Sequence, residues 1–276
     1  MQHHNLQSNE RDDQQLPSAH DLALIKSGGF LMGTSTRQVQ TLLRNEDWAE
    51  EWLDRGLFKV EQPQHTIQLA TYAIARAPVT NREYQEFILD TNHRIPRGWI
   101  GFSCPEELEN HPVTEVSLAD AIAFCSWLSE KTGKTFRLPT EAEWEQAARG
   151  DDGRMYPWGE KFDPWRCNTK ESGKAGTTHV HSYSPSGDSP WGVTDTSGNV
   201  MEWTNSTMQP YPFTHVPPES NNENVIVRGG SWYDRPTRAR SAFRLAYRPY
   251  QKVFNVGFRI VCRDLDQSSV TVAANQ

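Results

Sequence analysis

Cysteine is scarce in this chain, and long apolar runs are missing. Only four of 276 residues are cysteines, at positions 104, 125, 167 and 262, and none forms a C-x-x-C pair. This spacing argues against a zinc ribbon, a thioredoxin-like dithiol or a disulfide-dense scaffold. No stretch of about 18 apolar residues occurs, and residues 1–20 lack the apolar core of a secretory signal. We therefore expect no membrane partner, a cytoplasmic location and free thiols.

Positive charge and common catalytic motifs are also lacking. The chain has 28 Lys and Arg against 35 Asp and Glu, a formal net charge of −7. A protein that mainly grips nucleic-acid phosphates carries the opposite balance, so there is no strong nucleic-acid signal. The sequence contains no G-x-S-x-G, H-E-x-x-H, P-loop or G-x-G-x-x-G motif. It therefore gives no indication of a serine-hydrolase elbow, a zinc protease or a nucleotide-binding loop.

Aromatic residues and loop-forming residues dominate what is present. Aromatics make up 11% of the chain and include ten tryptophans, so rings can supply much of the core. Residues 150–224 are rich in Gly, Pro, Asn and Ser and are expected to form long loops. Residues 1–20 and 264–276 are polar. We expect a disordered leader and a flexible tail around one domain spanning residues 21–263.

Several segments carry clear helix or strand signals. Capping-box pairs, three residues apart, occur at Thr80 and Glu83, at Ser117 and Asp120, and at Thr140 and Glu143. Gly133 and Gly150 are expected to end the second and third of these helices. A further helix is expected within residues 36–56. Short strands are expected at Leu22–Ile25, His65–Leu69, Val225–Arg228 and residues 256–262.

Eight short motifs follow one another along the chain. They are GGFLMG (28–33), APVTNREY (77–84), HPV (111–113), RLPTEAEWE (137–145), YPWG (156–159), GNVMEW (198–203), RGGSW (228–232) and GFR (257–259). In this order they resemble the formylglycine-generating-enzyme (sulfatase-modifying factor) domain family over about residues 21–263. The resemblance implies a C-type-lectin-like α+β fold, rich in loops, with a few helices and short antiparallel strands. Such a fold does not by itself assign a function.

The resemblance also implies a structural calcium loop at residues 195–202. Asp195 and Glu202 would supply carboxylates, and Gly198 and Val200 would supply backbone carbonyls. Calcium prefers oxygen ligands of this kind, and glycine permits the tight bend. An ordinary capped turn that holds Trp203 in the core is the alternative, and both interpretations stay open.

The oxidase chemistry of the family requires two cysteines just after the Gly-Gly-Ser motif. Their thiolates bind copper, because Cu(I) prefers soft sulfur ligands. Asp234 and Ala239 stand at the two positions, and no thiol occurs between Cys167 and Cys262. We therefore expect no oxidase activity and no redox cofactor. A metal-dependent oxidoreductase relative without these cysteines, and a regulatory or scaffold module, remain as alternatives.

The C-terminal third resembles the variable proteins of diversity-generating retroelements. The pattern R-G-G-S-W-x3-P-x3-R-S-A-x-R-x4-P-x7-G-F-R runs through residues 228–259. In that family, adenine-directed mutagenesis, usually of AAC codons, diversifies residues between fixed positions, and the scaffold displays them to a ligand. Randomising the adenines of AAC cannot yield Lys, Gln, Glu, Met or Trp. Among the positions between the fixed residues, only Gln251 and Lys252 are of these types.

Large rings and guanidiniums between the fixed positions suit a binding surface. The expected ligand-binding residues are Tyr233, Asp234, Arg235, Thr237, Arg238, Phe243, Leu245, Tyr247, Arg248, Tyr250, Val253 and Phe254. Their spacing matches neither the apolar stripe of a helix nor the alternation of a strand, which favours a binding surface. Packing of these rings in the core is the alternative. We expect Tyr233, Tyr247 and Phe254 to share one solvent-accessible face. The sequence thus favours a non-catalytic binding protein whose ligand, a protein or a small molecule, is unknown.

Overall fold

The computed structural model describes residues 21–214 and 223–263, and the predicted leader and tail lie outside these ranges. One antiparallel sheet has the order β1-β4-β10-β5. Its strands are β1 (Leu22–Ile25), β4 (Tyr72–Ala75), β10 (Val261–Cys262) and β5 (Phe136–Arg137). A separate antiparallel pair joins β2 (Gly28–Met32) to β3 (His65–Leu69).

The second four-stranded sheet has the order β8-β7-β6-β9. Its strands are β8 (Leu245–Tyr247), β7 (Val225–Arg228), β6 (Met201–Thr207) and β9 (Val256–Phe258). Here β6 and β9 run parallel, and the other pairs are antiparallel. The single strand predicted over residues 256–262 is wrong, because β9 pairs with β6 whereas β10 pairs with β4 and β5. This stretch therefore links the two sheets.

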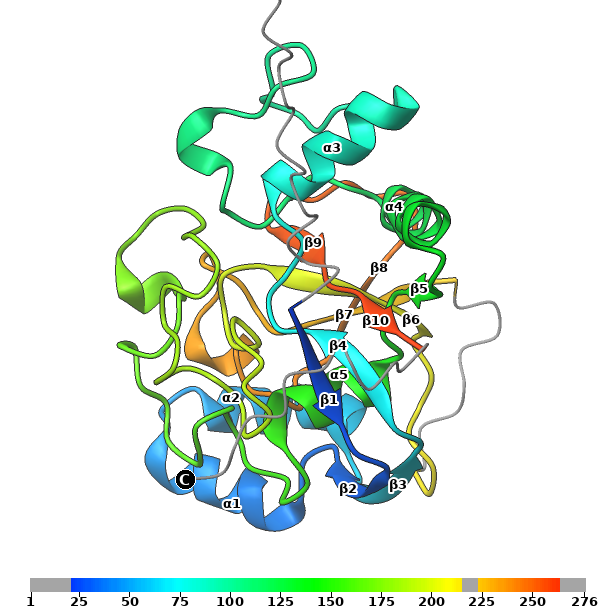
Figure 1. Ribbon diagram of the computed structural model, residues 1–276. Helices are drawn as coiled ribbons and strands as arrows, with labels where there is room; N and C mark the ends of the chain where they lie inside the picture. Colours follow the sequence, from blue (N-terminus) through cyan, green and yellow to red (C-terminus); the bar gives the residue numbers. More distant parts are fainter. Residues whose placement is uncertain (1–20, 215–222, 264–276) are drawn as a thin grey trace, which may run out of the picture.

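The described residues form five α-helices. They are α1 (Thr36–Asn45), α2 (Ala49–Asp54), α3 (Asn81–Thr91), α4 (Leu118–Thr132) and α5 (Glu141–Arg149). The predicted capping boxes are present at Thr80, Ser117 and Thr140, and α1 has another at Ser35. In Figure 1, α3 and α4 lie at one end and α1 and α2 at the other, with the two four-stranded sheets between them. None of the helices described is long and apolar enough to cross a membrane.

Short 3-10 helices occur in the connecting segments. They are η1 (Leu57–Glu61), η2 (Glu106–Leu108), η3 (Lys170–Ser172) and η4 (Pro236–Arg238). Residues 150–200 are otherwise mostly loop, as predicted. The prediction of loop up to residue 224 is wrong for β6, and residues 215–222 lie outside the described ranges. The loops are pinned by backbone bonds between distant segments, such as Asn199 N–H to Asn168 O at 2.7 Å. Such bonds satisfy buried polar groups that a loop-rich domain would otherwise leave unpaired.

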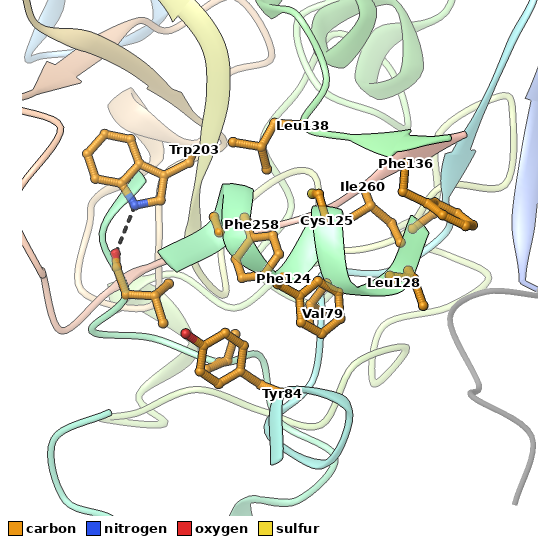
Figure 2. Close-up of a cluster of buried hydrophobic side chains, with 14 of the residues drawn as sticks. Val79, Tyr84, Phe124, Cys125, Leu128, Phe136, Leu138, Trp203, Phe258 and Ile260 are labelled. Atoms are coloured by element: carbon orange, nitrogen blue, oxygen red, sulfur yellow. Dashed lines mark hydrogen bonds between the residues drawn. The ribbon is translucent and has the colours of Figure 1, made fainter. Parts of the chain in front are cut away.

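Aromatic rings fill the main core between α3, α4 and β9 (Figure 2). The ring of Phe124 lies 6.0 Å from Tyr84 and 5.4 Å from Phe258. Trp203 donates its indole N–H to the carbonyl of Val116 at 3.0 Å, so its one polar atom is satisfied. Cys125 is buried in this core, and all four cysteines are free thiols.

Candidate functional site

Buried ion pairs hold the C-terminal segment from beneath. Arg240 forms two hydrogen bonds to Glu61 of η1, at 2.7 and 2.8 Å. Arg244 forms two to Glu141 of α5, at 2.6 and 2.9 Å, and Arg228 reaches the same carboxylate at 2.9 Å. Paired, bidentate bonds of this kind fix both the position and the orientation of a guanidinium. The backbone of residues 228–244 is therefore anchored to elements far away in the sequence.

A tight turn places Asp234, which the resemblance predicts at the first cysteine position. Gly230 has a φ of 66°, and a Cβ there would lie 2.7 Å from the carbonyl oxygen of Arg238, so only glycine fits. The buried Asp234 accepts hydrogen bonds from the Ser231 hydroxyl and, at 3.0 Å, from Arg238. Ala239, which the resemblance predicts at the second position, is also buried. The Asp234 carboxylate is therefore held in place by its hydrogen bonds.

A groove with a cavity volume of about 590 Å³ opens beside this turn. Seven of the predicted binding residues line it: Tyr233, Asp234, Arg235, Thr237, Arg238, Phe243 and Leu245. Six other lining residues were not predicted from the sequence as site residues. They are Trp52, Arg55, Leu57, Val60, Lys170 and Met208. No local sequence motif identifies these six residues. They come from α2, η1, η3 and the end of β6, which lie next to the C-terminal segment only in the folded chain.

Three of the lining residues are less exposed than expected. Asp234, Thr237 and Phe243 are buried, so they line the groove with little exposed surface. The ring of Phe243 packs 5.8 Å from that of Trp52, and the Arg238 guanidinium lies 5.9 Å above its centre. These three side chains are packed against the protein and are not free to move in the groove.

An exposed ring cluster, formed by Trp232, Tyr233 and Phe254, lies at the edge of the groove. Tyr233 and Phe254 are 60% and 45% exposed, and their rings meet edge to face at 5.3 Å. Trp232 lies 5.7 Å from each of them. Tyr247 is only half-buried against Trp203, and burial raises the pKa of its phenol. The predicted common face therefore holds for Tyr233 and Phe254, whereas Tyr247 belongs partly to the core.

The remaining predicted residues lie outside the groove, in the loop at 248–254. Arg248 is exposed, and Tyr250 is exposed by 72% of its surface. Val253 packs partly against the main core, and its carbonyl accepts the backbone N–H of Glu115 at 3.1 Å. This loop is thus partly core and partly free surface.

Gln251 and Lys252, the two residues that an AAC codon cannot yield, have structural contacts. The Gln251 side chain accepts the backbone N–H of Arg248 at 2.8 Å. The ammonium of Lys252 lies 2.7 Å from the carboxylate of Asp120, which caps α4. Both side chains hold the loop in place, whereas their neighbours Arg248, Tyr250 and Phe254 extend into solvent.

The predicted calcium ligands do not form a set that fits the ion. Both oxygens of Glu202 accept hydrogen bonds from Arg259, at 2.5 and 2.7 Å, and Trp144 donates to one of them at 2.7 Å. Arg259 and Glu202 thus form a buried, charge-assisted pair. A guanidinium occupies the carboxylate that would bind calcium, and a cation beside a cation is unfavourable.

Asp195 and Gly198 of the same loop form hydrogen bonds to other segments. Burial raises the pKa of Asp195 to about 7, and its carboxylate accepts the backbone N–H of His181 at 3.2 Å. The N–H of Gly198 donates to the carbonyl of Gly229 at 2.8 Å, which ties the loop to the Gly-Gly turn. Val200 is buried in the interior. Within residues 21–214 and 223–263 no group of three or more His, Cys, Asp or Glu could hold a metal ion.

Comparison with known proteins finds both enzymes and an inactive protein among the relatives of the chain. It is 32% identical to the formylglycine-generating enzyme of Streptomyces coelicolor over 275 residues, covering 77% of this chain and 84% of that protein. It is 30% identical to the inactive C-alpha-formylglycine-generating enzyme 2 of Mus musculus over 304 residues, covering 89% of this chain and 87% of that protein. The chain spans only 54% of another relative, the uncharacterized protein YfmG of Bacillus subtilis.

The fold is also that of Treponema denticola variable protein 1. The TM-score is 0.69 at 21% sequence identity, and the match covers 88% of this chain and 95% of that one. The sulfatase-modifying factor enzyme 1-like domain matches residues 7–264, nearly the whole chain. The chain therefore belongs to the sulfatase-modifying factor enzyme 1-like domain family, as its eight motifs predicted.

Proposed function

We propose that this chain is a non-catalytic binding protein whose ligand site is the groove together with the exposed ring cluster. The observation that carries the proposal is the position of Tyr233 and Phe254, which touch each other in solvent at the rim of a groove. Exposed rings that pack on one another beside a concave surface are typical of binding sites. The groove volume also lies in the range of ligand sites.

The frame beneath these rings suits binding without catalysis. Buried ion pairs and the Gly230 turn keep the backbone in one conformation, so little conformational entropy is lost when a ligand binds. The Asp234 carboxylate is engaged by Ser231 and Arg238. Burial raises the pKa of the Cys125 and Cys167 thiols to about 12, so neither offers a thiolate at neutral pH. The inactive relative from Mus musculus is consistent with this proposal.

We further propose that the site belongs to the variable protein of a retroelement. The support is the division of the 248–254 loop into anchoring and exposed side chains. Gln251 and Lys252 are held by hydrogen bonds and by an ion pair, whereas Tyr250 and Phe254 are free to change without loss of core contacts. Sequencing the DNA that flanks the gene tests this. A near-copy of the segment encoding residues 228–262, differing mainly at adenines and beside a reverse transcriptase gene, is expected, and its absence would contradict the assignment.

Binding itself is tested by selecting ligands from a random peptide library displayed on phage. Peptides enriched on the wild-type chain should lose about tenfold or more in affinity for Tyr233→Ala and Phe254→Ala, since truncating a central ring costs on the order of 1–2 kcal/mol or more. Phe102→Ala is the matched control, because Phe102 is 48% exposed and lies outside the groove. If the selected peptides bind all three variants equally well, the proposed site is wrong.

A further inference from the structure

Cationic side chains gather in the groove of a chain whose net charge is −7. The lining contains five cations, Arg55, Lys170, Arg235, Arg238 and Arg244, and a single acid, Asp234. A concave surface lined by one sign of charge strengthens the local potential and attracts the opposite charge. The groove therefore differs in sign from the molecule as a whole.

Two of these cations form no ion pair with a described carboxylate. Arg55 pairs with Glu51 at 2.8 Å, Arg238 with Asp234 at 3.0 Å, and Arg244 with Glu141 at 2.6 Å. Within the ranges that the structure describes, neither Lys170 nor Arg235 has an ion pair, and both are exposed. The charge of the groove is thus incompletely compensated, and it favours an anionic ligand.

The position of Lys170 is fixed by the same turn that forms the site. Its backbone N–H donates to the carbonyl of Asp234 at 2.9 Å, so η3 is tied to the residue next to Arg235. The two unpaired cations therefore come from segments that are bonded to each other. Two nearby cations can bind carboxylates that are carried by one ligand.

Apolar side chains cover another part of the groove. Leu57 and Val60 of η1, Met208 and Phe243 all contribute to its lining. A small, fully hydrated anion would leave this surface exposed to water. A ligand that carries both apolar and acidic groups would use the two kinds of surface together.

The groove also borders an unpaired sheet edge. Among the described strands, β8 lies at the edge of its sheet and pairs only with β7, and Leu245 and Ala246 of β8 line the groove. In an antiparallel strand, alternate residues direct their N–H and C=O groups away from the neighbouring strand. In the described part of the chain, no backbone group of Leu245–Tyr247 bonds to anything except β7. Such an edge is a template for an additional strand.

We propose that the groove binds an extended, acidic peptide segment of a partner protein, which adds a strand to the free edge of β8. Its carboxylates pair with Lys170 and Arg235, and its apolar side chains lie on the surface formed by Leu57, Val60 and Met208. Main-chain bonds supply affinity in this mode, and side-chain pockets supply specificity. The inference rests on the proposed function and names the ligand class for the same site.

The test uses fluorescence anisotropy with a dye-labelled octapeptide of alternating Val and Glu. A copy with Gln in place of Glu removes the charge, and a copy with alternate backbone N-methyl groups removes strand pairing. We expect the acidic peptide to bind at least tenfold more tightly than either copy, and to weaken as salt is raised. Equal binding of the Gln or N-methyl copy would overturn the inference, as would displacement of the peptide by an equal concentration of inorganic phosphate.

Charge reversal in the protein provides the second arm. The double variant K170E/R235E should lose about 100-fold in affinity for the acidic peptide and gain affinity for a Val-Lys peptide. The control K174E/R94E makes the same charge change at exposed residues outside the groove and should bind within about threefold of the wild type. Circular dichroism checks that both variants are folded. If both bind alike, the inference is wrong.

The two proposals fail in different ways. If ring-dependent peptides are selected from the library but the acidic octapeptide does not bind, only the acidic-peptide inference falls. If no selected peptide depends on Tyr233 or Phe254, the binding site itself is wrong, and the inference falls with it.

Discussion

At the scale of single residues, arginines of the C-terminal segment divide into two groups that the sequence does not distinguish. Arg240 and Arg244 are buried against carboxylates, whereas Arg235 and Arg238 are exposed at the groove. All four stand in one stretch of 10 residues, 235–244. The sequence motif predicted Arg240 and Arg244 as fixed positions, but their partners Glu61 and Glu141 are too distant in sequence to be predicted.

The bidentate pair between Arg240 and Glu61 predicts a large effect on stability. Glu61→Gln leaves the Arg240 guanidinium buried without a counter-charge, and we expect a loss of about 3 kcal/mol or more in the free energy of unfolding. Glu51→Gln removes only the exposed pair with Arg55 and should cost less than about 1 kcal/mol. Urea denaturation followed by Trp fluorescence measures both. Equal losses would show that the buried pair does not anchor the segment.

Asp195 predicts a dependence of stability on pH. Burial raises its pKa in the folded chain to about 7 from an ordinary value of 3.8. The folded state therefore keeps a proton that the unfolded state loses, so this contribution to stability is fully present below about pH 4 and declines as the pH rises to 7. The slope from one such group reaches about 1.4 kcal/mol per pH unit.

Asp195→Asn keeps an oxygen that can accept the His181 N–H and cannot ionise. We expect the unfolding free energy of this variant not to fall between pH 4 and 7 as it does in the wild type. Urea denaturation curves recorded across that pH range measure this. Asp54→Asn, at an exposed site on α2, should keep it. An unchanged slope in Asp195→Asn would mean that another group is responsible.

At the scale of elements, local signals predicted the helices better than the strands. The capping boxes at Thr80, Ser117 and Thr140 each mark the start of a helix, because side chain and backbone satisfy each other within four residues. β6 was missed, because its first four residues are all buried and show no alternation. The division of residues 256–262 between two sheets depends on partners in β4, β5 and β6, which no local pattern reveals.

The Gly-Gly turn is the element that places the site, and it gives a direct prediction. Gly230→Ala must adopt a left-handed backbone, which costs about 1–2 kcal/mol, and its Cβ would also meet the carbonyl of Arg238. We expect a lower melting temperature and weaker binding of library-selected peptides. Gly176→Ala is the control, since nothing lies within 4 Å of a Cβ there and its φ is not positive. Equal behaviour of the two variants would contradict the role of the turn.

At the scale of the whole molecule, the motifs were sufficient to predict the family and the general α+β fold. They predicted one wall of the groove, because residues 233–245 are contiguous in sequence. The other wall, from α2, η1 and η3, is placed by long-range contacts such as Arg240 with Glu61 and Lys170 with Asp234. The calcium loop stays a prediction, and the ion pair of its carboxylate Glu202 with Arg259 could likewise not be predicted from local sequence.

The geometry of that loop predicts that the fold does not depend on calcium. Because Arg259 already neutralises Glu202, adding calcium or the chelator EGTA should shift the melting temperature by less than about 1 °C. Differential scanning calorimetry at fixed ionic strength measures this, with magnesium as the control ion. A calcium-specific rise of several degrees would show that the loop binds the ion, by mass action on the folded state.

The most direct test of the binding site is a crystal structure of the chain with a peptide selected from the library. We predict that the peptide lies in the groove, in contact with Tyr233, Phe243 and Phe254. A peptide bound on another face, with these rings still exposed to solvent, would contradict it.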